Sequence, residues 1–234
     1  MIEIKNISKK FGKLEVLKNV SVSCNSGQCI ALIGPNGCGK TTLIKSILGM
    51  VIPDSGSMEF NQKSIFGDYL YREKIGYMPQ IGRYPDTMTI GEIIEMVKKI
   101  RNSKDNLDED LFRDFEIEKM LNKQMRTLSG GTTQKISAVL AFMFNPDVLI
   151  LDEPTAGLDP LAAEVLKEKI IKEKGKGKLI LITSHLLSEL DDLISEIIFM
   201  QDGKIFFHKK VNELKEETQE DKISKANAKI LRAN

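Results

Sequence analysis

Short apolar runs separated by helical stretches occupy most of this chain. The runs at 28–33, 75–78, 147–152, 179–183 and 196–200 predict strands. The segments 41–49, 160–174 and 186–193 predict helices between them. Because strands and helices alternate, the pattern predicts a mostly parallel sheet covered on both faces. Residues 2–7 and 14–23 instead alternate in polarity and predict strands of an outer sheet, and 57–60 predicts a further short strand.

Helical periodicity replaces the strand pattern between residues 89 and 144. The apolar residues that fall on one face are Ile90, Ile93, Ile94 and Val97. We expect about residues 88–140 to form a helical insertion within a domain that spans residues 1–211. Residues 212–234 are charged and helix-prone, and they show no apolar face wide enough to predict docking on that domain.

Composition narrows the classes of protein. The 234 residues are 41% hydrophobic, which suffices for one domain with a sizeable core. A net charge of +1 gives no electrostatic footprint for nucleic acid. The longest apolar stretch, Ala138 to Phe144, is far shorter than the roughly 18 residues of a membrane span. Residues 1–11 show no signal peptide, and the odd set Cys24, Cys29 and Cys38 favours a reducing cytosol over a disulfide framework.

A glycine-rich loop stands between a predicted strand and a predicted helix. It reads Gly34-Pro35-Asn36-Gly37-Cys38-Gly39-Lys40-Thr41-Thr42. In that context, backbone N–H groups converge on phosphate oxygens, and the helix N-terminus adds positive potential. Lys40 is predicted to reach the β- and γ-phosphates, and the Thr41 hydroxyl to ligate Mg²⁺. The spacing therefore predicts a nucleotide site.

Two adjacent carboxylates, Asp152 and Glu153, follow the buried run 148–151. Buried carboxylates are costly unless a cation or a proton compensates them, and ligands bind at this end of parallel strands. Asp152 is the natural Mg²⁺ partner, and Glu153 is the natural base or water-orienting residue for attack on the γ-phosphate.

A second glycine element, Ser129-Gly130-Gly131, precedes an apolar helical pattern. A small polar residue followed by glycines at a helix start makes a second anion site. By itself this segment is also compatible with a plain helix cap.

Together these segments resemble the nucleotide-binding domain of ABC ATPases over about residues 2–210. Leu128-Ser129-Gly130-Gly131 is similar to the signature element of that family. Gln80 matches its glutamine loop, and His185 matches its switch histidine. Phe11, before Gly12, matches the aromatic residue that stacks on adenine.

The resemblance implies a fold and a set of ligands. The expected fold is α/β, a P-loop NTPase core with a mostly parallel sheet, an antiparallel β subdomain and an inserted α-helical subdomain. The implied cofactors are ATP and Mg²⁺, the metal being held by Thr41, Gln80 and Asp152. Lys40, Gln80, Glu153 and His185 are the implied catalytic residues.

The resemblance also implies partners. Two copies would sandwich two ATP molecules, each between one chain's phosphate loop and the other chain's Ser129–Gly131, and Asp159 would help the copies communicate. A separate membrane permease would dock at Gln80 to Ile93, including Arg83, Tyr84 and Pro85. The chain would then lie on the cytoplasmic face of the membrane, without a nucleic-acid partner.

Competing functions remain. A soluble ABC ATPase acting on ribosomes or DNA is the alternative class, although the ribosome-acting members usually carry two domains and the chromosome members carry long coiled coils. Within transport, the stretches 129–144 and 184–193 resemble ATPases of exporter-type permeases. A particular likeness is to those that serve nitrous-oxide-reductase maturation through copper or sulfur supply.

Two positions depart from the family pattern. Thr132 replaces the usual Gln after Ser-Gly-Gly, which puts in doubt a contact to the nucleotide sugar across the dimer. Cys38 stands where small residues are usual, and it is either a reactive thiol or an inert filler. His208 lies in a charged terminal segment and is expected to have no functional role.

Overall fold

The computed structural model describes residues 1–102, 106–184, 187 and 190–233. Within them, a six-stranded sheet has the strand order β10-β9-β3-β8-β7-β6. Its strands are β3 (Cys29–Ile33), β6 (Ile75–Met78), β7 (Val148–Asp152), β8 (Leu179–Thr183), β9 (Glu196–Gln201) and β10 (Lys204–Lys210). All neighbouring pairs are parallel except β9 and β10. Every residue of β3, β7 and β8 is buried, because both faces of this sheet are covered.

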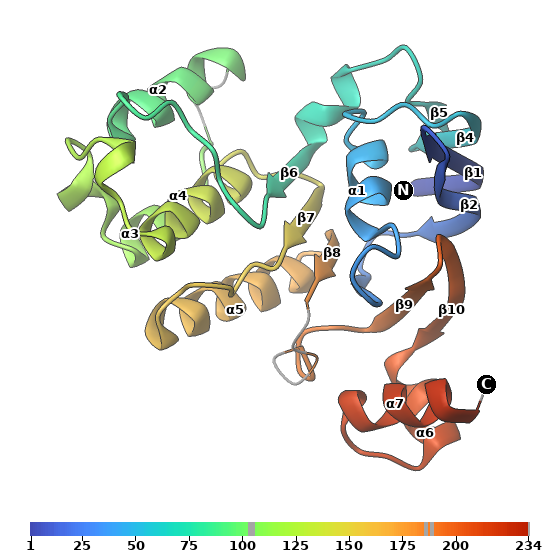
Figure 1. The fold of residues 1–234 in the computed structure, drawn as a ribbon. Helices are drawn as coiled ribbons and strands as arrows, with labels where there is room; N and C mark the ends of the chain where they lie inside the picture. Colours follow the sequence, from blue (N-terminus) through green and yellow to red (C-terminus); the bar gives the residue numbers. More distant parts are fainter. Residues whose placement is uncertain (103–105, 185–186, 188–189, 234) are drawn as a thin grey trace.

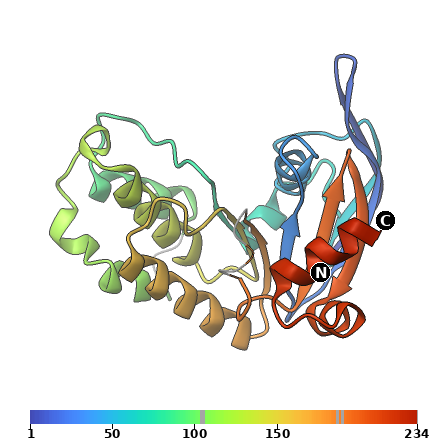
Figure 2. The same cartoon turned by 60° about the horizontal axis from the view of Figure 1, so that its bottom comes forward.

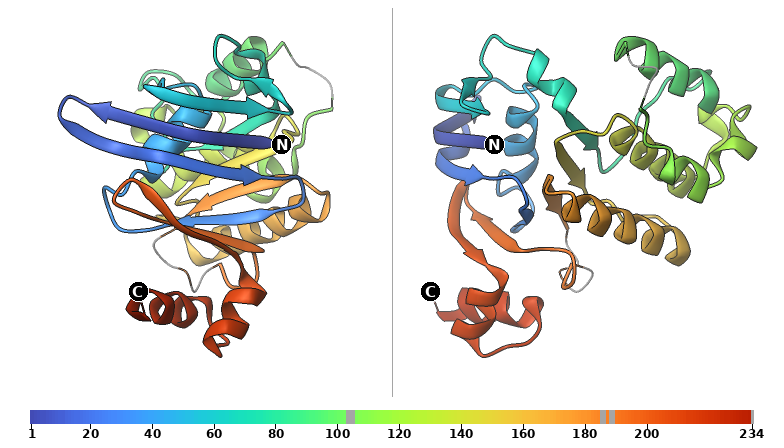
Figure 3. Two further views of the ribbon diagram at one scale, coloured as in Figure 1. Left: turned by 90° about the vertical axis from the view of Figure 1, so that its right-hand side faces the viewer. Right: turned by 180° about the vertical axis from the view of Figure 1, so that it is seen from behind.

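A second, antiparallel sheet has the order β2-β1-β4-β5. Its strands are β1 (Ile2–Phe11), β2 (Leu14–Cys24), β4 (Ser55–Phe60) and β5 (Lys63–Ser64). The β1–β2 hairpin extends beyond the rest of the molecule (Figure 3). Helix α1 (Lys40–Ile47) packs against this sheet through Leu43 and Ile44, which lie in one buried cluster with β1, β2, β4 and part of β3.

The helical part lies on the opposite side of the central sheet (Figure 1). It contains α2 (Ile90–Ile100), α3 (Asp110–Asp114), the short 3₁₀ turns η2 (Ile117–Met120) and η3 (Met125–Thr127), and α4 (Gly130–Phe142). A further 3₁₀ turn, η1 (Leu70–Lys74), precedes β6. Thr89 and Glu92 form a capping box that starts α2. Helix α4 packs on the edge strand β6 and contacts α2 and α3, so it joins the helical part to the sheet.

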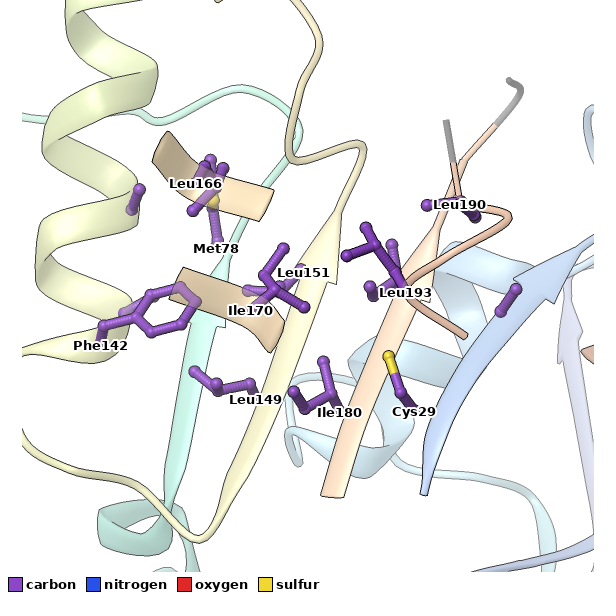
Figure 4. Packing of buried hydrophobic residues seen from close by; sticks show 14 of the residues in the cluster. Cys29, Met78, Phe142, Leu149, Leu151, Leu166, Ile170, Ile180, Leu190 and Leu193 are labelled. Atoms are coloured by element: carbon purple, nitrogen blue, oxygen red, sulfur yellow. The ribbon is translucent and has the colours of Figure 1, made fainter. Parts of the chain in front are cut away.

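The larger buried cluster lies between the central sheet and the helices α4 and α5 (Pro160–Gly175). Figure 4 shows Phe142 of α4 and Ile170 of α5 pointing toward Leu149 of β7. Met78 of β6 and Leu166 of α5 complete this contact. These contacts hold β6 and β7 against α4 and α5 and so fix the carboxyl end of β7.

A charged network joins α5 to the start of α3. Lys169, whose exposed fraction is only 5%, pairs with Asp108, Asp110 and Glu173. Burial alone would raise the pKa of Glu173, but hydrogen bonds from Lys176, Lys178 and Lys169 outweigh it and lower that pKa to about 2. Glu173 is therefore a buried, charged acid whose partners come from its own helix and the segment that follows it.

The terminal segment differs from the sequence prediction. Lys204–Lys210 forms strand β10, which was not predicted, and α6 (Val211–Thr218) and α7 (Ile223–Ala233) follow it. Figure 2 shows these two helices beside β9 and β10. Val211, Leu214 and Ile223 lie in the larger buried cluster. The expectation that this segment does not dock is therefore wrong, because a narrow apolar stripe suffices where the chain returns to the sheet.

Two further observations complete the fold. Residues 186, 188 and 189 of the predicted helix 186–193 lie outside the described residues, and its described part at 190–193 forms a bend and a turn instead of a helix. Over the ranges that the structure describes, no helix is both long and apolar enough to cross a bilayer.

Candidate functional site

A cleft of about 460 Å³ opens where the phosphate loop meets the carboxyl end of β7. We call it the nucleotide cleft. It is lined by Leu14, Val16, Asn36, Gly37, Gly39, Lys40, Thr41, Thr42, Gln80, Asp152 and Glu153. The structure thus brings together most of the phosphate loop, Gln80 and the two carboxylates, which come from segments more than a hundred residues apart in the sequence.

The phosphate loop is folded around its own lysine. Lys40 Nζ donates to the carbonyl oxygens of Gly34 at 2.7 Å and Pro35 at 3.2 Å. Gly34 has a φ of +148°, and a Cβ on it would lie 2.0 Å from the Met200 carbonyl oxygen, so only glycine fits there. Cys38 is 3% exposed, with its Sγ 3.9 Å from Lys40 Nζ. The ammonium of Lys40 therefore lies at the loop that would surround a phosphate.

The carboxylates at the end of β7 are held by the neighbouring strand. The Thr183 hydroxyl donates to Asp152 Oδ1 at 2.5 Å and accepts from the Glu153 N–H at 3.0 Å. Glu153 has a φ of +53°, an unfavourable backbone conformation for a residue with a side chain. The Thr183 contacts hold this turn, which brings the Glu153 side chain to the cleft. From the sequence alone, Thr183 is only the last residue of the predicted strand 179–183, without an assigned role.

The donors in the cleft fit Mg²⁺. Magnesium in nucleotide sites is held by one or two carboxylates and a hydroxyl together with phosphate oxygens, and not by a cage of protein acids. Thr41, Gln80 and Asp152 supply oxygens of this kind to the same cleft. The part of the chain that the structure describes holds no cluster of three or more His, Cys, Asp or Glu residues that would form such a cage. The negative charge of Asp152 also acts on the neighbouring strand β6. Burial raises the pKa of the Tyr77 hydroxyl there, and the charge of Asp152 raises that pKa further.

The signature segment, Ser129–Gly131, does not line the nucleotide cleft. It begins α4, where the Ser129 hydroxyl accepts from the Thr132 N–H at 3.2 Å. Ser129 and Gly130 are exposed, and the first turn of α4 has no acidic residue. The positive end of α4 is therefore open at Ser129 and Gly130, while Gly131 lies against the backbone of Gly157.

Phe11, the residue expected to stack on adenine, does not line the nucleotide cleft. It lies at the end of β1 and is 51% exposed. Its ring has Lys9 Nζ 5.5 Å from the centroid. Leu14 and Val16 line the cleft instead, and sequence reasoning missed them. These two residues are two positions apart just after the hairpin turn, so both lie on one face of β2. This spacing is the sequence feature that could have identified them.

The other residues singled out from the sequence are His185, His208 and the segment that contains Arg83. His185 lies outside the described residues, so its role stays a prediction. His208 Nε2 lies 2.7 Å from Glu196 Oε2 on the neighbouring strand, away from the cleft. Arg83, Tyr84 and Pro85 line a separate groove of about 520 Å³, where the Tyr84 hydroxyl is 2.9 Å from Ser137 Oγ.

A phosphate loop between a strand and a helix, facing two carboxylates at the end of a neighbouring parallel strand, defines a P-loop nucleotide-binding protein. The ABC transporter family model matches residues 17–156, and the chain belongs to that family. It is an ABC ATPase, as the sequence resemblance predicts.

Known ATP-binding proteins of transport systems are similar to this chain in sequence, and a solved one is similar in fold. The Nod factor export ATP-binding protein I of Ralstonia nicotianae is 30% identical, over 92% of this chain and 68% of that protein. The lantibiotic transport ATP-binding protein SrtF of Streptococcus pyogenes is 32% identical, over 89% of this chain and 90% of its own length. A solved ATP-binding subunit of an ABC transporter superposes with a TM-score of 0.90 at 26% identity, covering 99% of both chains. The predicted fold class is confirmed.

Proposed function

We propose that this chain is the ATP-hydrolysing subunit of an exporter-type ABC transporter, and that two copies close on two ATP molecules to drive a separate permease. The observation that carries the proposal is that the nucleotide cleft and the signature segment of one chain lie apart from each other. The nucleotide cleft holds Lys40, Asp152 and Glu153, while Ser129–Gly131 lies outside it, with Ser129 and Gly130 exposed. A second chain that meets the cleft with its own signature segment would complete each site.

Within one completed site, each side chain has a distinct role. The phosphate-loop N–H groups and Lys40 bind the β- and γ-phosphates, once Lys40 exchanges its two carbonyl partners for phosphate oxygens. Thr41, Gln80 and Asp152 hold Mg²⁺, which supplies charge neutralisation at the phosphates when bound. Glu153 orients the attacking water and accepts its proton. The switch histidine, His185, is assigned from the resemblance alone.

The transport role has its own support. Both relatives described above are ATP-binding proteins of transport systems, one for Nod factor export and one for a lantibiotic. The groove beside Arg83 and Tyr84 begins at Gly82, two residues after Gln80 of the nucleotide cleft, so a permease segment seated there would contact the chain close in sequence to a cleft residue. We place the permease contact at this groove.

Light scattering after gel filtration tests the dimer. Glu153→Gln should bind ATP without hydrolysing it, and its mass should rise with ATP and Mg²⁺ to twice the 26.3 kDa of one chain. Glu153→Gln combined with Ser129→Arg keeps the nucleotide cleft but blocks the signature segment Ser129–Gly131. This double variant should remain monomeric. A dimer that forms equally in both variants would refute the composite site.

Co-purification tests the permease. Arg83→Glu changes the charge of the groove without touching the nucleotide cleft. We expect the wild-type chain to retain a membrane protein encoded beside it, and Arg83→Glu to lose that protein while keeping ATP turnover. Equal retention by the two chains would contradict the proposed docking site.

A further inference from the structure

The first two turns of α4 touch the loop of residues 153–159 of the same chain. Lys135 Nζ lies 2.7 Å from Asp159 Oδ2. The Gln134 amide nitrogen lies 3.5 Å from the carbonyl oxygen of Glu153, a long hydrogen bond. The start of α4 is thus connected to both ends of the loop that begins at the hydrolytic carboxylate.

A backbone contact reinforces these side-chain contacts. A Cβ placed on Gly131 would lie 2.5 Å from the carbonyl oxygen of Gly157, the central part of the same loop. No side chain fits between the two backbones, so a displacement of the signature segment toward the loop is passed on directly. The contact explains why a glycine is required at position 131 in addition to any phosphate contact.

Lys135 is held in place from two sides. Its Nζ lies 5.8 Å from the ring centroid of Phe115, which follows α3, and its side chain is 24% exposed. On the other side, Asp159 uses Oδ2 for Lys135 and Oδ1 to accept from the Ala162 N–H at 2.9 Å, which caps α5. One carboxylate therefore links α4 to the N-terminus of α5. The hydrogen bond from Lys135 also lowers the pKa of Asp159, so this carboxylate stays ionised to more acidic pH than an ordinary aspartate.

We propose that Lys135 is a positioning residue for ATP hydrolysis, which acts through Asp159 on the loop that begins at Glu153. The inference rests on the proposed function, in which Ser129–Gly131 binds the nucleotide of the second chain. Contact with that nucleotide fixes α4. Lys135, Gln134 and Gly131 then fix the loop, and Glu153 reaches its position at the chain's own nucleotide. The ion pair therefore couples the two ATP sites through contacts within each chain.

A double-mutant cycle on ATP turnover tests this coupling. Lys135→Met keeps the aliphatic stem against Phe115 and removes the charge, while Asp159→Asn keeps the oxygen that caps α5. Lys135→Arg restores the charge. Lys167→Met is the matched control, because the Lys167 side chain is 25% exposed and pairs with Glu164 at 3.7 Å within α5.

We expect Lys135→Met and Asp159→Asn each to lower kcat by about threefold to tenfold, the size of coupling between contacting charged groups, with KM for ATP changed less than about twofold. The double variant should be no slower than the slower single variant. Lys135→Arg should recover most of kcat, and Lys167→Met should match the wild type.

Effects that multiply in the double variant would overturn the coupling, as would a Lys135→Met kcat indistinguishable from that of Lys167→Met. If Lys135→Met does not fold, as judged by circular dichroism, failure of Asp159→Asn to lower kcat overturns the proposal. These results leave the ATPase assignment intact when the wild type turns over ATP and Glu153→Gln does not. A wild type without turnover would instead overturn the proposed function together with this inference.

Discussion

Docking of the terminal helices gives a stability prediction that follows from one buried side chain. Leu214 of α6 has an exposed fraction of 0% and belongs to the larger buried cluster, with Val211 and Ile223. Leu214→Ala removes three carbon atoms, which corresponds to about 2.4 kcal/mol of lost transfer free energy at roughly 0.8 kcal/mol per carbon. The remaining cavity adds a smaller term, because a helix near the surface partly closes over it. The sum is about 3 kcal/mol.

Differential scanning calorimetry measures this effect. For a chain of this size, about 3 kcal/mol corresponds to a fall in Tm of roughly 6 to 12 °C. Leu161→Ala is the matched control, since Leu161 also lies on a helix but is 76% exposed. We expect its Tm to change by no more than about 2 °C, the effect of an ordinary surface substitution. A Leu214→Ala variant as stable as Leu161→Ala would refute the docked position of α6.

Three further predictions concern single side chains. Because its pKa is lowered, Glu173 stabilises the fold fully above its ordinary pKa of 4.5 and loses that contribution as the pH falls toward about 2. Urea denaturation should therefore show that the difference in unfolding free energy between the wild type and Glu173→Gln shrinks over this pH range. A difference that stays constant would contradict the prediction. Alkylation of Cys38 should inhibit ATP turnover, and ATP should protect, because Cys38 lies in the phosphate loop with its Sγ 3.9 Å from Lys40 Nζ. The reaction should be selective, since burial raises the pKa of Cys24 and Cys29 to about 12 and leaves them unreactive. Full activity after complete modification at Cys38 would show it to be an inert filler. Thr132→Gln should increase the ATP-dependent dimer fraction in sedimentation velocity, since the longer side chain extends from the start of α4 toward a second chain, and an unchanged fraction would remove Thr132 as a cause of weaker closure.

Contiguous motifs explain why much of the site was predictable. The phosphate loop and the pair Asp152 and Glu153 each consist of neighbouring residues, so their chemistry is visible in the sequence itself. Thr183 could not be assigned in this way, because its role depends on the parallel register that places it beside Asp152. Lys135 and Asp159 are likewise 24 residues apart, and only the packing of α4 beside the loop brings them together.

Burial of charged and weakly apolar helices was the part that sequence reasoning missed. Lys169 and Glu173 have the spacing of a solvated helix face, yet both are buried. Lys169 pairs with Asp108 and Asp110, and Glu173 pairs with Lys169, Lys176 and Lys178. The apolar positions of α7, such as Ile223, stand among lysines in a narrow stripe. Whether such a stripe is buried depends on where the chain returns to the sheet, which is a property of the tertiary structure.

The measurement that tests the composite site most directly is ATP turnover by a mixture of two inactive variants. Glu153→Gln lacks the hydrolytic carboxylate, and Ser129→Arg blocks the signature segment, so neither should turn over ATP alone. When the two variants are mixed in equal amounts before ATP is added, each dimer that combines one chain of each kind has one complete site. We predict turnover above the sum of the two variants measured separately and at most about a quarter of the wild-type rate, because random pairing in a twofold dimer sets that ceiling and the Ser129→Arg chain weakens closure at the other site. Turnover no higher than the sum of the two variants measured separately would contradict the claim that two chains complete each other's sites.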